Sequence, residues 1–104
     1  MACDFLFLVY GTVGCYKDAS SLAIQTLEGT DPLLDGEYSS RRYPIAKCAL
    51  AAMRKGYRMF ALQDGGSCAS SVTAQQTYDK YGKSNTCMAD GEGGSSANQV
   101  YQLY

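Results

Sequence analysis

The clearest pattern along the chain is a stripe of apolar residues at helical spacing between residues 40 and 55. Its members recur at intervals of three and four, which places them on one face of a helix: Ile45, Cys48, Ala49, Ala52 and Met53. Ser39 or Ser40 can cap the start of this helix, and Gly56 can take the left-handed conformation that ends it. The stripe therefore predicts a helix over about residues 40–55 that packs against a core.

Extended segments lie on both sides of this helix. Apolar residues bounded by turn signals predict strands over residues 5–10, 22–27, 57–63 and 98–104. The capping-box spacing of Thr73 and Gln76, with Gly82 beyond it, predicts a short helix over about 73–81. Residues 83–97 form a long loop without periodicity, which in a compact domain is usually functional or disordered. Together these elements predict a small α+β domain with an antiparallel sheet of about four or five strands on one main helix.

Residues 5–10 differ from the other strands because they are apolar on both strand faces. Such a segment is either buried on two sides or pairs with another chain. One expected partner is therefore a second copy of the chain, which would form a homodimer through residues 3–10.

Composition limits the classes of function. The 104 residues, 46% of them apolar, suit one domain over residues 1–104 with one core. The formal net charge of −1 provides no basic field for nucleic acid, and no apolar run approaches the roughly 20 residues of a membrane span. The absence of histidine excludes His-dependent catalytic triads and the usual zinc sites. We expect a protein that is not an enzyme.

The five cysteines indicate the compartment. None of them has the C-x-x-C spacing of zinc sites or thioredoxin-like motifs. We expect two disulfides among the last four cysteines, in an oxidising compartment, so the protein is predicted to be secreted. Reduced, buried cysteines are the alternative. Cys3 is left over, either as a reactive or intermolecular thiol or as an unpaired terminal residue.

Three acidic residues lie at glycine-rich turns: Asp64, Asp90 and Glu92. Glycoside hydrolysis needs two converging carboxylates, which a sequence alone does not show. Calcium is a cofactor that oxygen ligands of this kind can bind, although the twelve-residue EF-hand pattern is absent. The third interpretation is that these residues simply build turns. We expect no cofactor, with calcium as the alternative.

Residues 14–18 resemble the opening of a WSC domain, a small cysteine-bridged fold. Over residues 10–102 the chain is similar to WSC-like or apple-like modules of secreted marine invertebrate proteins, and the segments that carry the similarity are 27–36, 60–71, 89–94 and 97–101. The resemblance implies disulfides between Cys48 and Cys68 and between Cys15 and Cys87. Two departures are that WSC domains usually carry eight cysteines, and that related modules tend to place Trp near positions 67 and 96, where this chain has Ser.

The resemblance implies a binding module, since WSC domains are associated with polysaccharides and apple-type modules with proteins or glycans. Our first hypothesis is a lectin-like module whose partner is a glycan or glycoprotein. Its ligand-binding residues would be polar groups at strand ends and in the 83–97 loop: Gln63, Asp64, Asp90, Glu92 and Asn98. The alternative is a structural or interaction protein that self-assembles through its apolar N-terminal strand and Cys3.

Overall fold

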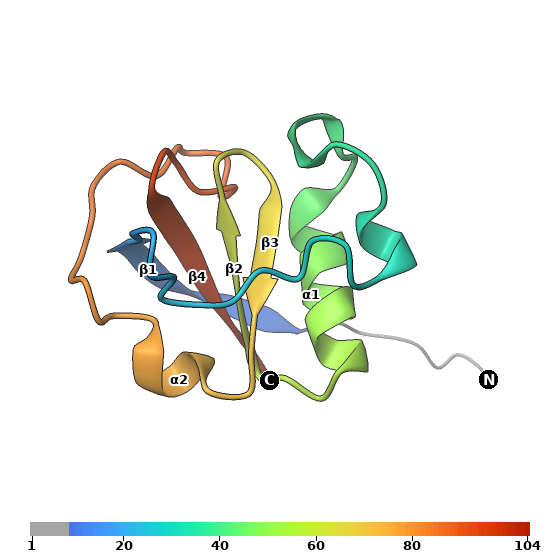
Figure 1. Ribbon diagram of the computed structural model, residues 1–104, viewed down its shortest axis with the longest axis horizontal. Coiled ribbons are helices and arrows are strands. Elements are labelled where there is room, and N and C mark those ends of the chain that lie inside the picture. The colour runs from blue at the N-terminus through green and yellow to red at the C-terminus, as the bar shows by residue number, and fades with distance from the viewer. Residues whose placement is uncertain (1–8) are drawn as a thin grey trace.

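Four strands form one antiparallel sheet in the computed structural model, which describes residues 9–104 (Figure 1). They are β1 (Tyr10–Lys17), β2 (Met59–Gln63), β3 (Ser67–Ser70) and β4 (Ala97–Leu103), and their spatial order is β1-β4-β2-β3. The longest strand pairing joins β1 to β4, with Tyr10 opposite Leu103 and Lys17 opposite Ala97. The predicted α+β fold with an antiparallel sheet is confirmed.

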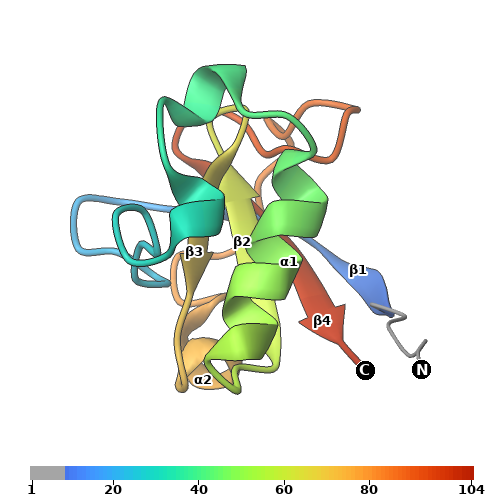
Figure 2. The same ribbon diagram turned by 90° about the vertical axis from the view of Figure 1, so that its right-hand side faces the viewer.

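Side chains of alternate residues on β2 and β4 point to opposite faces of the sheet, and each face carries its own core. On one face, Phe60, Leu62 and Tyr101 pack against helix α1 (Pro44–Arg54). On the other face, Ala61 and Val100 pack against Ile24 and against the short helix α2 (Ala74–Thr77). Figure 2 shows α1 in front of the sheet and α2 near the lower end of the sheet. The sheet is thus the middle layer between two small cores.

Helix α1 begins four residues later than the predicted start at residue 40. Its first residue is Pro44, and the preceding Tyr43 takes a left-handed conformation with φ of 53°. Because a proline disfavours helical geometry in the residue before it, a continuous helix does not extend back through Tyr43. Residues 38–40 instead form a separate 3₁₀ turn, and no side chain caps α1. At the other end, Gly56 adopts φ of 79°, as predicted for the residue that ends the helix.

Two other predicted elements differ from the structure. Residues 22–27 are not a strand of the sheet: only Thr26 forms an isolated bridge, to Ala69. The predicted helix over 73–81 is helical only at Ala74–Thr77, and Thr73 makes no capping hydrogen bond because its own φ and ψ are not extended. Strand β3 was not predicted. The predicted strand over 5–10 lies mostly outside the described residues.

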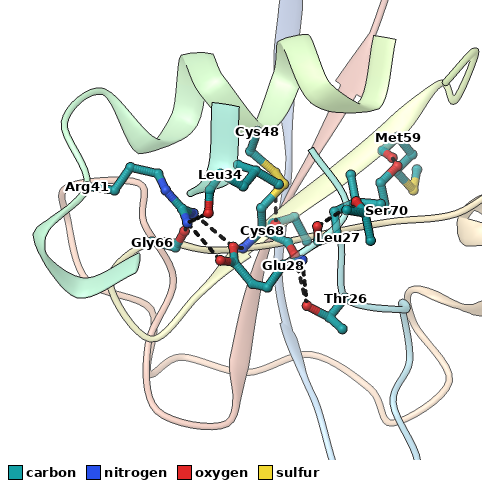
Figure 3. The surroundings of a disulfide bond; sticks show 12 residues. Thr26, Leu27, Glu28, Leu34, Arg41, Cys48, Met59, Gly66, Cys68 and Ser70 are labelled. Carbon is teal, nitrogen blue, oxygen red and sulfur yellow. Dashed lines mark hydrogen bonds and ion pairs between the residues drawn. A yellow bond between two sulfur atoms is a disulfide. The ribbon is translucent and has the colours of Figure 1, made fainter. Parts of the chain in front are cut away.

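Both disulfides implied by the resemblance are present. Cys48 and Cys68 join α1 to β3 within the core, where each residue is 0% exposed (Figure 3). Cys15 and Cys87 join β1 to the long loop that precedes β4. One bridge therefore holds the main helix to the sheet, and the other holds the loop to an outer strand.

Candidate functional site

One end of the molecule carries most of the predicted ligand-binding residues. Three separate segments meet there: the β2–β3 turn at residues 64–66, the glycine-rich loop at 88–94, and the stretch at 38–43 that precedes α1 (Figure 1). We call this surface the polar end. It is built by loops: backbone hydrogen bonds join the turn to the glycine-rich loop, and the side chains of Tyr38 and Arg41 attach the 38–43 stretch to the turn.

The glycine-rich loop is packed closely against the end of β2. Asp64 and Gly65 donate backbone hydrogen bonds of 3.1 and 3.0 Å to the carbonyls of Gly94 and Glu92. Gly93 has φ of 84°, and a side chain there would overlap the backbone of Leu62 and of Gln63. This close approach needs glycine, because any Cβ would push the loop off the strand. The acidic residues of the loop are therefore held in place by main-chain packing.

Asp64 is the exposed residue of the turn, and it accepts a hydrogen bond from a tyrosine of the neighbouring segment. The Tyr38 hydroxyl lies 3.1 Å from Oδ2 of Asp64. The hydrogen bond to Asp64, followed by the negative charge of that carboxylate, raises the pKa of Tyr38 above its ordinary value. A phenol is protonated at neutral pH even at its ordinary pKa, so the Tyr38 hydroxyl is a hydrogen-bond donor there.

Asp90 and Glu92 lie together on the loop. Oδ1 of Asp90 accepts a 2.9 Å hydrogen bond from the backbone N–H of Glu92, which forms a turn stabilised by the aspartate side chain. Partial burial, and then the charge of Asp90, raise the pKa of Glu92 above its ordinary value. A hydroxyl donor approaching these carboxylates would relieve part of this repulsion and desolvation.

Gln63 and Asn98 are placed differently from the three acidic residues. They are cross-strand partners on β2 and β4, so their side chains point to the same face of the sheet. Gln63 donates a 2.9 Å hydrogen bond to Oδ2 of Asp18, and Asn98 is only 1% exposed. Within residues 9–104, Nδ2 of Asn98 has no hydrogen-bond partner. A dissolved ligand reaches the acidic residues but not Asn98 in this arrangement.

Sequence reasoning missed two aromatic residues of the polar end, Tyr38 and Tyr43. Tyr43 is 73% exposed, and its backbone is left-handed at the point where the chain enters α1 at Pro44. Neither residue belongs to a periodic pattern, so only the dipeptide Tyr43-Pro44 marks a turn in this region. The ring of Tyr38 adds apolar surface with a polar tip beside Asp64, and Tyr43 adds an exposed ring on the same segment.

A second surface lies at the opposite end, where β4 and α1 finish. It contains a cleft of about 320 Å³, whose lining includes Val9, Met53, Tyr57, Arg58, Leu103 and Tyr104. Three of these side chains are well exposed: Val9 at 54%, Met53 at 47% and Tyr104 at 78%. We call this surface the apolar end. It combines apolar walls with one guanidinium group.

In the part of the chain that the structure describes, no three His, Cys, Asp or Glu side chains gather closely enough to hold a metal ion. None of the helices among residues 9–104 is long and apolar enough to cross a membrane. Comparisons with protein-family models, with curated proteins and with solved structures find no match to this chain. The similarity to WSC-like and apple-like modules therefore remains a prediction from the sequence.

Proposed function

We propose that this chain is a secreted carbohydrate-binding module whose ligand lies on the polar end. The observation that supports this most directly is the meeting of carboxylates and tyrosines from three segments around a closely packed loop. The two disulfides are compatible with an extracellular location. No catalytic role is proposed for any of these residues.

The chemistry of the polar end suits sugar hydroxyls. The carboxylates of Asp64, Asp90 and Glu92 accept hydrogen bonds, and the hydroxyl of Tyr38 both donates and accepts them. The exposed ring of Tyr43 offers a flat apolar surface for the C–H face of a pyranose. The ligand would be a neutral or basic glycan, because an acidic one would meet three carboxylates.

The affinity for a single sugar would be low. A shallow surface offers a ligand of about a dozen heavy atoms roughly 0.3 kcal/mol per atom, which corresponds to a dissociation constant on the order of millimolar. Longer glycans, or several copies of the module, would raise the apparent affinity by multivalency.

A glycan-array screen of the oxidised protein tests this proposal, with hits measured again by NMR titration. The D64N and E92Q variants should lose binding while keeping the spectrum of a folded protein. D79N removes an exposed carboxylate outside the polar end and should bind like the original chain. Running the screen with calcium and with a chelator tests the calcium alternative. A blank array with folded protein in both buffers would reject the carbohydrate proposal.

The second candidate function is self-association, which the apolar end favours. Val9, Met53 and Tyr104 expose apolar surface around one cleft, and surfaces of this kind are common at protein interfaces. A second form of association, the intermolecular bridge expected of Cys3, involves a residue outside the described ones. Measuring the mass in solution over a range of concentrations, for the original chain and for the C3S variant, separates the two forms of association.

A further inference from the structure

The two outer strands of the sheet, β1 and β3, have most of their free edges covered by the chain itself. Along β3, the segment at residues 25–27 forms backbone hydrogen bonds with Cys68 and Ser70, at 2.9 Å in each case. Along the second half of β1, Ser84 donates to the carbonyl of Cys15 at 3.0 Å, and Lys17 donates to the carbonyl of Gly82 at 2.9 Å. These additions satisfy edge groups that would otherwise invite another strand.

The first half of β1 lacks such a cover among residues 9–104. The N–H of Tyr104 donates a 2.9 Å hydrogen bond to the carbonyl of Val9, so Val9 directs its backbone groups toward β4. Backbone direction alternates along an antiparallel strand, and the register continues through Tyr10 opposite Leu103 to Thr12 opposite Tyr101. The N–H and C=O groups of Tyr10 and the N–H of Thr12 therefore point away from the sheet.

This open stretch also lacks the features that usually protect an edge. Residues 9–16 contain no charged residue and no proline. Beside it, Val9 is 54% exposed, Tyr10 38% and Tyr104 78%. The irregularity in register between Thr12 and Gly14 bends the strand and limits new pairing to the residues before it.

We propose that the open edge at Tyr10–Thr12 pairs antiparallel with the same edge of a second copy of this chain. This inference rests on the second candidate function and names its contact. An uncharged strand meets its own copy across a two-fold axis without like-charge repulsion, and the net charge of −1 opposes association only weakly. Pairing by the chain's own N-terminal residues would need a tight turn, and residues 5–9 contain no glycine, proline, asparagine or aspartate to make one.

The T12P variant tests the contact, because proline removes an N–H that faces outward and leaves the hydrogen bonds of Val9 and Gly11 to β4 in place. The original chain and the C3S variant should both form a dimer, measured by sedimentation equilibrium without reductant so that the two internal disulfides stay intact. In T12P each copy loses one hydrogen bond across the axis, and the dimer dissociation constant should rise by about 30-fold or more. The matched control T12V keeps the N–H and should dimerise normally.

T12K serves as a second variant if T12P does not fold, since two lysines across the axis repel and should also give a monomer. A dimer dissociation constant that is unchanged in folded T12P and T12K overturns the proposed edge but leaves self-association standing on another surface. A dimer that is lost in C3S also overturns the edge and assigns the contact to a disulfide of Cys3. If the original chain is a monomer, both the proposed edge and the second candidate function are rejected. This holds also if the edge pairs with a different protein.

Discussion

Arg41 and Glu28 form an ion pair inside the molecule that holds three segments together. The guanidinium donates hydrogen bonds of 2.7 and 2.8 Å to the two carboxylate oxygens, and the Arg41 side chain is 1% exposed. Arg41 also donates to the carbonyls of Leu34 and Gly66, while Glu28 accepts from the N–H of Cys68 (Figure 3). The pair thus connects the loop before α1 to β3 and to the β2–β3 turn of the polar end.

Replacing Arg41 by methionine should destabilise the protein by about 3 kcal/mol. The change leaves the Glu28 carboxylate without its cation and two buried carbonyls without donors, and breaking a buried pair by removing one partner costs this much. R42M is the matched control, because Arg42 is exposed and its loss should change stability by less than about 0.5 kcal/mol. Chemical denaturation of both variants measures the difference. Equal stability of R41M and R42M would show that the ion pair contributes nothing.

Stability should fall in acid because of Glu28. Burial alone would raise the pKa of Glu28, but the hydrogen bonds from Arg41 and Cys68 and the charge of Arg41 outweigh burial and lower it below 4.5. A carboxyl whose pKa is lower in the folded state stabilises the protein above its unfolded pKa, and this contribution disappears as pH falls through the folded value. The E28Q variant should therefore lose less stability than the original chain between about pH 5 and pH 3. Parallel pH profiles for the two proteins would contradict this assignment.

Two elements were predicted closely from the positions of their apolar residues. The stripe from Ile45 to Met53 marks α1, and the last strand was predicted within one residue of Ala97–Leu103. Strand β3 escaped prediction because Ser67–Ser70 is a short run of small residues with no apolar alternation. Its position depends on pairing with β2 and on the disulfide at Cys68, which are long-range interactions.

The candidate site was predicted only in part. The acidic residues at positions 64, 90 and 92 were found through their glycine-rich turns, and the structure gathers them at one end. Tyr38 joins them through its hydrogen bond to Asp64, 26 residues away in the sequence, and no local sequence pattern predicts such a contact. The disulfide pairing likewise came from resemblance, because four cysteines allow three connectivities and their spacing does not choose among them.

Removing the bridge between Cys15 and Cys87 should loosen the polar end before it loosens the helix. The bridge spans 72 residues, and its loss should cost about 4 kcal/mol by the entropy of the unfolded chain. In the double variant C15A/C87A, amide hydrogen exchange should accelerate first at Met88 and Gly94, while α1 keeps its own bridge at Cys48. Uniform acceleration throughout the chain would instead show that the loop and the core unfold as one unit.

Replacing Gly93 by alanine should damage the polar end more than its backbone conformation alone explains. Gly93 and Gly36 both have φ of 84°, but a Cβ on Gly36 meets nothing within 4 Å, whereas one on Gly93 overlaps the backbone of β2. G36A should therefore cost about 1 kcal/mol through its left-handed conformation, and G93A roughly 1–3 kcal/mol more through the overlap. Thermal denaturation gives both values. NMR chemical-shift changes in G93A should concentrate at Asp64 and Glu92, since their segments are joined by the displaced loop. If both variants lose the same stability, the loop moves aside at no cost and does not hold the carboxylates in place.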